Sequence, residues 1–194
     1  GGVRVSVVSG REHLEEHRPC VFVFNHQSKL DVPVLIHLLQ HDFTGVAKKE
    51  VRTVPVIGQI FDVAGMVFID RGDSAKARAQ LEPAVRKLRD EGVSLVLAPE
   101  GTRSSTPRLG AFKKGAFHIA MQAGVPMVPI VMRNTGELMW RGAQLIKPGT
   151  IEVQVLPPVD TSSWTPQTVD AHVAEVRQQF LTTLAEWPTS GEER

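Results

Sequence analysis

Hydrophobic positions along the chain follow two patterns: short continuous apolar runs, and longer stretches with apolar residues at helical spacing. The runs predict strands and the spaced stretches predict helices that bury one face. The predicted strands cover residues 3–7, 20–24, 43–47, 66–69, 93–98, 126–132 and 151–155. The predicted helices cover residues 31–39, 74–91, 114–123 and 169–184. Because the two kinds of element interleave throughout, we expect an α/β fold, a single domain with a largely parallel central sheet flanked by helices.

One apolar stretch, residues 54–69, fits neither pattern. It is interrupted by Pro55, Gly58, Gln59, Asp62 and Gly65, and a membrane-spanning helix needs about 18–20 continuous apolar residues. The stretch is therefore too broken to cross a bilayer, but it is apolar enough to line a cavity or to touch a membrane surface. Plain core packing is the alternative.

Composition narrows the class of protein. The 194 residues are 42% hydrophobic and 22% charged, which excludes a mainly disordered or fibrous chain. A single cysteine, Cys20, excludes a disulfide framework and a cysteine-clustered metal site. The net charge of +1 does not favour a nucleic-acid partner. Because the chain begins Gly1-Gly2 with no charged-then-apolar segment, we expect no secretory leader. We expect residues 1–194 to form one domain, alone or excised from a longer chain with upstream membrane-docking helices or a partner domain.

Charge is unevenly distributed. Residues 45–115 hold thirteen Lys and Arg against eight Asp and Glu, whereas residues 150–194 hold two against seven. A basic middle segment fits an anionic ligand. Solvated helix faces would give the same counts, so charge alone leaves both interpretations open.

The first chemical motif is the run 25–31, NHQSKLD, between a buried-type strand and a predicted helix. His26 lies where ligand clefts open in α/β sheets. Asp31, in the first helical turn, can accept a hydrogen bond from one ring nitrogen and leave the other as a base. The alternative is a loop histidine followed by a helix-capping aspartate.

The second motif, residues 99–104, follows the strand 93–98 and contains Glu100, Gly101, Thr102 and Arg103. Glycine lets the backbone approach a ligand, and arginine binds phosphate through two parallel hydrogen bonds. A surface turn with an ordinary arginine is the alternative.

Two further groups of cations stand beside predicted elements. Lys113 and Lys114 precede the helix 114–123, where amides and lysines suit an anion. Lys48 and Arg71 flank the apolar stretch, an arrangement that suits a ligand with a phosphate head and a hydrocarbon chain. A structural Asp70–Arg71 pair is the alternative for that arginine.

Taken together, these motifs resemble the glycerolipid acyltransferase family, specifically the 1-acylglycerol-3-phosphate (lysophosphatidic acid) acyltransferases. The resemblance runs from residue 21 to residue 132 in the expected order. Residues 25–31 are similar to the family's His-x4-Asp motif, residues 67–71 to the end of its second block, residues 100–103 to its Glu-Gly-Thr-Arg motif and residues 125–130 to its proline-punctuated strand. Ala98 departs from the aromatic residue that often precedes Pro-Glu-Gly.

The resemblance implies transfer of a fatty acyl group from acyl-CoA or acyl carrier protein to the hydroxyl of lysophosphatidic acid, with no further cofactor. Glycerol 3-phosphate and other lysophospholipids are alternative acceptors. It also implies a membrane surface as partner, on the cytoplasmic side, with the protein peripheral or anchored through segments outside this chain.

The resemblance also distributes roles among the residues. His26 would act as general base, oriented by Asp31, and backbone N–H groups near the first motif would stabilise the oxyanion. Glu100 would order its loop or contact the glycerol, and residues 55–66 would form part of an acyl-chain tunnel. The remaining substrate-binding candidates, most of them for the acceptor phosphate, are Lys48, Arg71, Gly101, Thr102, Arg103, Lys113 and Lys114.

Three other classes of protein compete with this interpretation. A serine or cysteine hydrolase lacks a Gly-x-Ser-x-Gly elbow, and Cys20 opens a buried-type strand. A zinc enzyme would need glutamate where Leu38 stands between His37 and His41, so we expect surface histidines and no metal. A lipid-binding module gives no reason for the pairing of a histidine with an aspartate.

Overall fold

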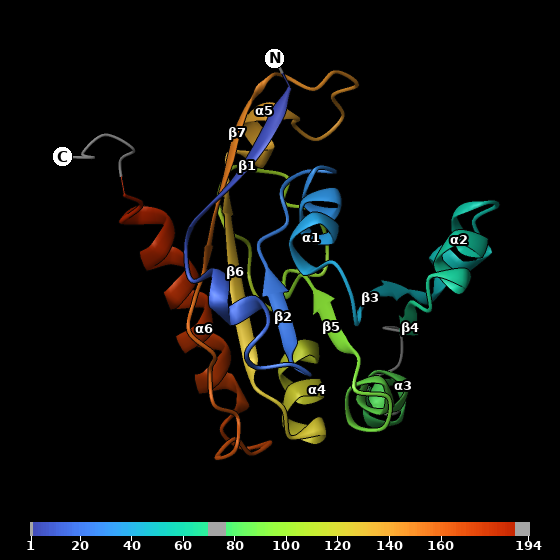
Figure 1. Cartoon of the computed structure of the whole chain (residues 1–194). Helices are drawn as coiled ribbons and strands as arrows, with labels where there is room; N and C mark the ends of the chain where they lie inside the picture. The colour runs from blue at the N-terminus through green and yellow to red at the C-terminus, as the bar shows by residue number, and fades with distance from the viewer. Residues whose placement is uncertain (1, 70–76, 189–194) are drawn as a thin grey trace.

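A seven-stranded sheet runs through the centre of the molecule (Figure 1). The structure is a computed structural model that describes residues 2–69 and 77–188. In spatial order the strands are β1 (Val3–Ser9), β7 (Gly149–Val155), β6 (Met127–Arg133), β2 (Val21–Phe24), β5 (Ser94–Leu97), β3 (Phe43–Lys48) and β4 (Val67–Ile69). Among these neighbours only β6 and β7 pair antiparallel. The predicted α/β fold with a largely parallel sheet is confirmed.

The central strand β2 separates two hydrophobic cores. Val21 and Val23 belong to one core, whereas Phe22 and Phe24 belong to the other, and none of them is more than 6% exposed. Successive side chains of a strand point to opposite faces, so a continuous apolar run is what a strand covered on both faces requires.

Helices cover both faces of the sheet. The core that contains Val21 is closed by α3 (Ala77–Arg89), α4 (Gly115–Ala123) and α6 (Val169–Ala185). The opposite core is closed by α1 (Asp31–Leu39), the short 3₁₀ helix η1 (Arg11–Leu14) and α5 (Thr135–Leu138). None of the helices in the described part of the chain is long and apolar enough to cross a bilayer.

The interrupted apolar stretch extends away from the body of the molecule, beside β3 and β4 (Figure 1). It forms the 3₁₀ helix η2 (Lys49–Thr53) and the short helix α2 (Ile57–Val63), of which only Gly58 is buried. Val63 is 91% exposed and Val56 is 63% exposed. Plain core packing therefore does not explain this segment.

Candidate active site

His26 and Asp31 meet where β2 ends and α1 begins. Nδ1 of His26 lies 2.7 Å from Oδ2 of Asp31, as the spacing of the first motif predicts. The same oxygen accepts the backbone N–H groups of Gln27 and Ser28, at 2.8 and 2.9 Å. Asp31 is fully buried, and the partly exposed His26 ring packs edge-on against Phe24. The imidazole is thus held through Nδ1, which leaves Nε2 as the nitrogen that can meet a substrate.

Glu100 joins the second motif to the first. Its Oε1 accepts the backbone N–H of His26 at 2.9 Å, and its Oε2 accepts that of Gly110 at 2.8 Å. The backbone N–H of Ser104 in turn donates to the carbonyl oxygen of His26 at 2.8 Å. Burial raises the pKa of Glu100, and the two N–H donors partly oppose that rise. Of its two expected roles, these contacts favour ordering the loop over touching the glycerol.

Three backbone N–H groups of the first motif are already engaged. Those of His26, Gln27 and Ser28 all donate to carboxylates, and the stabilisation of the oxyanion by N–H groups near this motif stays a prediction. The physical reason is that buried carboxylates require hydrogen-bond donors and take the nearest ones.

An apolar cavity of about 640 Å³ opens beside His26. His26, Lys48, Gly101, Thr102 and Arg103 all line it, so the structure places these five sequence-predicted residues around one cavity. The apolar wall comes from α1, from β3 and from residues 49–66 around η2 and α2, which we call the α2 segment. It includes Val32, Ile36, Phe43, Ile60, Phe61 and Met66. A volume of this size is typical of sites for small molecules and lipid chains.

Two other candidates lie elsewhere, and a third falls outside the part of the chain that the structure describes. Lys113 and Lys114 do not line the cavity. Nζ of Lys114 lies 2.7 Å from the Asp170 carboxylate of α6, so a neighbouring helix already supplies its counter-charge. Arg71, together with Asp70, lies outside the described residues.

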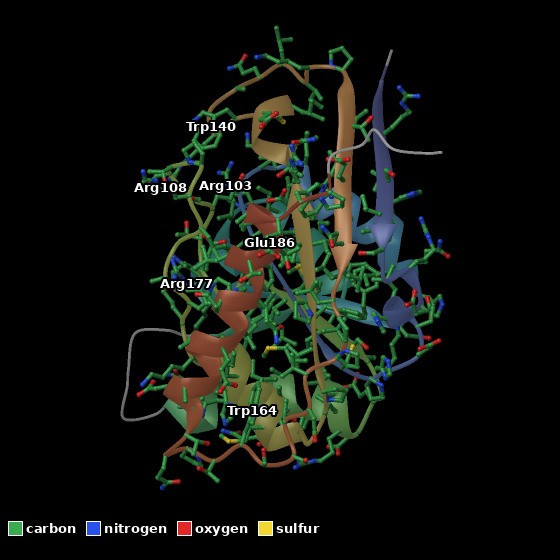
Figure 2. The ribbon with its side chains drawn as sticks, turned by 90° about the vertical axis from the view of Figure 1, so that its left-hand side faces the viewer. Arg103, Arg108, Trp140, Trp164, Arg177 and Glu186 are labelled. Atoms are coloured by element: carbon green, nitrogen blue, oxygen red, sulfur yellow. The ribbon has the colours of Figure 1, made fainter. Side chains whose placement is uncertain are left out.

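The loop after α5 contributes residues that the sequence patterns did not single out. Arg141 donates to the carbonyl oxygen of Arg103 at 3.3 Å, and Ser28 Oγ donates to that of Met139 at 2.8 Å. In Figure 2, Trp140, Arg108 and Arg103 gather at the same end of the molecule. More than a hundred residues separate this loop from the first motif, and no local pattern marks its approach.

The chain is similar in sequence to several known proteins. The model of the Acyltransferase family matches residues 5–133. The 1-acyl-sn-glycerol-3-phosphate acyltransferase of Limnanthes alba is 36% identical over 178 residues, which cover 91% of this chain. The alpha form of the human enzyme of that name is 36% identical over 190 residues, covering 98% of this chain and 67% of the human protein.

A solved structure gives the same result for the fold. The crystal structure of PlsC, the 1-acyl-sn-glycerophosphate (LPA) acyltransferase of Thermotoga maritima, superposes with a TM-score of 0.74 at 28% identity, covering 97% of this chain and 75% of that one. This chain spans 62% of the length of the Limnanthes alba relative. Because the family model matches more than half of the chain and relatives share more than a third of their aligned residues with it, the chain belongs to the Acyltransferase family.

Proposed function

We propose that this chain transfers a fatty acyl group from a thioester, acyl-CoA or acyl carrier protein, to the free hydroxyl of lysophosphatidic acid, which gives phosphatidic acid. The names of the 36% identical relatives support this acceptor. The observation that carries the proposal is the His26–Asp31 pair beside an apolar cavity that Lys48 and Arg103 also line. A thioester chain fits the apolar part, and a phosphate fits the cations.

In the proposed reaction, Nε2 of His26 takes the proton of the acceptor hydroxyl as that oxygen attacks the thioester carbonyl carbon. Asp31 holds the ring in position and stabilises the imidazolium that forms. When the tetrahedral intermediate collapses, the carbon–sulfur bond breaks and the leaving thiolate takes the proton from His26. The products are an ester and a free thiol, and no covalent enzyme intermediate is required.

Replacing His26 by alanine tests this mechanism. We expect His26→Ala to lower kcat by about 10²–10⁴-fold, the usual contribution of a general base, while the fold is retained. The assay follows one labelled acyl-CoA with a panel of acceptors, and mass spectrometry identifies the products. His37→Ala is the matched control, because His37 is exposed on α1 and does not line the cavity. Substantial turnover by His26→Ala would end the general-base assignment.

Arg103 provides a separate test of the phosphate site. It lines the cavity, and no acidic side chain among the described residues pairs with it, so its charge is available to an anion. We expect Arg103→Ala to raise the acceptor KM by roughly tenfold or more and to change the thioester KM much less. An unchanged acceptor KM would remove Arg103 from the phosphate site.

A thioester hydrolase is the alternative enzyme, and the lining of the cavity counts against it. No serine or cysteine is among the described residues that line the cavity. Burial raises the pKa of the Cys20 thiol to about 12, so this buried cysteine is a poor nucleophile. The acceptor panel separates the two functions, because a hydrolase would consume thioester when no acceptor is present.

We also propose that the partner surface is a lipid membrane, on its cytoplasmic side. The α2 segment supports this, since its exposed apolar side chains stand beside the cavity and close to the cations Lys48 and Arg52. Apolar residues next to cations are typical of elements that lie in the interface of an anionic bilayer.

A further inference from the structure

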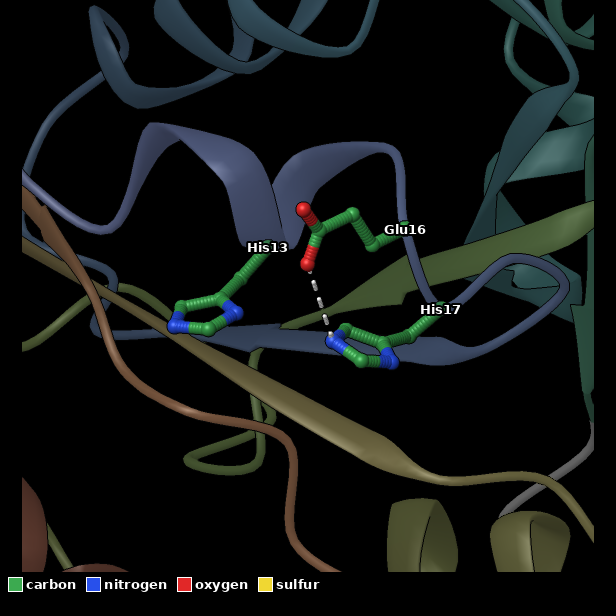
Figure 3. Close-up of side chains that lie close together, drawn as sticks. All are labelled: His13, Glu16 and His17. Atoms are coloured by element: carbon green, nitrogen blue, oxygen red, sulfur yellow. Dashed lines mark ion pairs between the residues drawn. The ribbon is translucent and has the colours of Figure 1, made fainter.

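We propose that His13, Glu16 and His17 form a binding site for one Zn²⁺ ion, separate from the candidate active site. The three side chains converge from the turn that joins β1 to β2 (Figure 3). One potential ligand atom from each lies within 4.8 Å of the other two, and no other group of three such residues in the described parts of the chain does so. The proposal does not depend on the acyltransfer reaction.

The spacing of the three residues explains their convergence. The segment begins as η1 and continues as a turn, so residues three and four apart lie on one side of it. The ring centroids of His13 and His17 are 5.7 Å apart, and Oε2 of Glu16 lies 3.7 Å from Nε2 of His17. Donor atoms around tetrahedral zinc lie roughly 3.3 Å apart, given bonds of about 2.0–2.2 Å. The exposed Glu16 side chain can rotate to bring its carboxylate closer, and the partly exposed His17 ring can turn toward His13.

A second observation comes from His13 itself. Its Nδ1 is buried and has no hydrogen-bond partner in the described structure. Figure 3 shows one nitrogen of this ring facing Glu16 and His17. The opposite nitrogen, Nε2, lies 3.7 Å from the carboxylate of Glu12. A histidine that binds a metal through one nitrogen and contacts a carboxylate through the other is the usual arrangement at zinc sites.

The donor set selects the metal. Two imidazoles and one carboxylate, with water in the fourth position, suit Zn²⁺, whereas Mg²⁺ and Ca²⁺ prefer oxygen ligands throughout. The turn lies just before β2, and His26 lies just beyond its far end, so the ion would be remote from the reacting groups. Leu14, within the same turn, is 2% exposed and packs into the core. Zinc would therefore stabilise the connection between β1 and β2.

Isothermal titration of the full chain with ZnCl₂ tests the site. We expect one equivalent of zinc to bind, and His13→Ala/His17→Ala to lower the affinity at least tenfold. The matched control is His37→Ala/His41→Ala, which has the same four-residue spacing. In that pair α1 ends at Leu39, and His41 contacts Asp42 at 3.0 Å and Glu15 at 3.7 Å, so the two histidines do not converge. We expect the control to bind zinc like the unmodified chain.

Two further measurements keep the proposal falsifiable if the double variant folds poorly. Glu16→Gln changes only an exposed side chain, and we expect it also to weaken zinc binding. At 100 times the Kd, zinc should raise the Tm of the unmodified chain by about 5–10 °C. Equal zinc affinity in the unmodified chain, Glu16→Gln and the His13/His17 variant would overturn the proposal. Loss of binding in the His37/His41 control, or no stoichiometric binding at all, would overturn it too.

Discussion

At the scale of single residues, two buried carboxylates organise the loops around His26. One oxygen of Asp31 accepts hydrogen bonds from the imidazole and from two backbone N–H groups. Each oxygen of Glu100 accepts one backbone N–H group. A buried carboxylate is costly unless it is hydrogen-bonded, so each acid fixes the path of the chain that supplies its donors. Of the two acids, Asp31 bonds the imidazole itself, whereas Glu100 bonds the backbone of His26 and is a positioning residue.

The pH dependence of stability tests the burial of Glu100. Because burial raises its pKa above the ordinary value of 4.5, the native state binds this proton more tightly than the unfolded state. The resulting contribution to the free energy of unfolding is complete below pH 4.5 and is lost as the pH rises through the native pKa. We expect the stability advantage of the unmodified chain over Glu100→Gln to be larger at pH 4 than at pH 7, as measured by urea unfolding.

At neutral pH, Glu100→Gln should still be less stable than the unmodified chain by roughly 1–3 kcal/mol. The side-chain nitrogen of glutamine cannot accept a hydrogen bond, so either the N–H of His26 or that of Gly110 would lose its partner. Glu186→Gln is the control, since Glu186 is an exposed acid that directly follows α6 (Figure 2). A difference that grows with pH for Glu100→Gln would contradict the assignment.

At the scale of elements, sequence pattern predicted best where burial is continuous. The strands β2 and β5 and the helix α1 lie within one residue of their predicted bounds, because an apolar run or a helical stripe leaves few alternatives. The four-residue elements η1 and α5 were not predicted, since so few residues show no periodicity. The antiparallel pairing of β6 with β7 depends on contacts between distant residues, which no local pattern encodes.

In the candidate site, too, contacts between residues close in sequence were predictable and contacts between distant residues were not. His26 and Asp31 are five residues apart, so local geometry predicts their contact. Gly110 and Arg141 reach the first and second motifs only through the course of their loops, and the sequence gives no sign of this. The metal-binding geometry of His13 was missed because the turn that carries it was not recognised.

The exposed face of α2 leads to a prediction about membranes. Ile57 is 46% exposed and Val63 is 91% exposed, and burying such a side chain contributes about 1.5–3 kcal/mol. We expect Ile57→Asp/Val63→Asp to lower binding to vesicles that contain anionic lipid by at least tenfold, measured by co-flotation. Val8→Asp, on the edge strand β1, is the control because Val8 is also exposed. Unchanged binding of the α2 variant would mean that another surface meets the lipid.

At the scale of the whole molecule, α6 supports the loop around Glu100 and Gly110 through a chain of contacts. Arg177 of α6 donates to the carbonyl oxygens of Gly110 and Leu109, at 2.9 and 3.1 Å, and it faces that loop in Figure 2. Gly110 donates to Glu100, which accepts the N–H of His26. A Cβ on Gly110 would lie 2.9 Å from Glu100 Oε2, so the contact depends on glycine. The final helix therefore helps to position a residue far from it in sequence.

Replacing Arg177 tests whether this support reaches the chemistry. We expect Arg177→Ala to lower kcat roughly 3–30-fold and to leave the acceptor KM nearly unchanged, because Arg177 lies outside the cavity but holds the loop that holds His26. Arg177→Lys should recover part of kcat, since one ammonium can bond one of the two carbonyl groups. Arg86→Ala, which removes an exposed arginine from α3, is the control. A raised acceptor KM with unchanged kcat would instead place Arg177 in contact with substrate. If neither kcat nor KM changed, the role of α6 would be limited to closing the hydrophobic core.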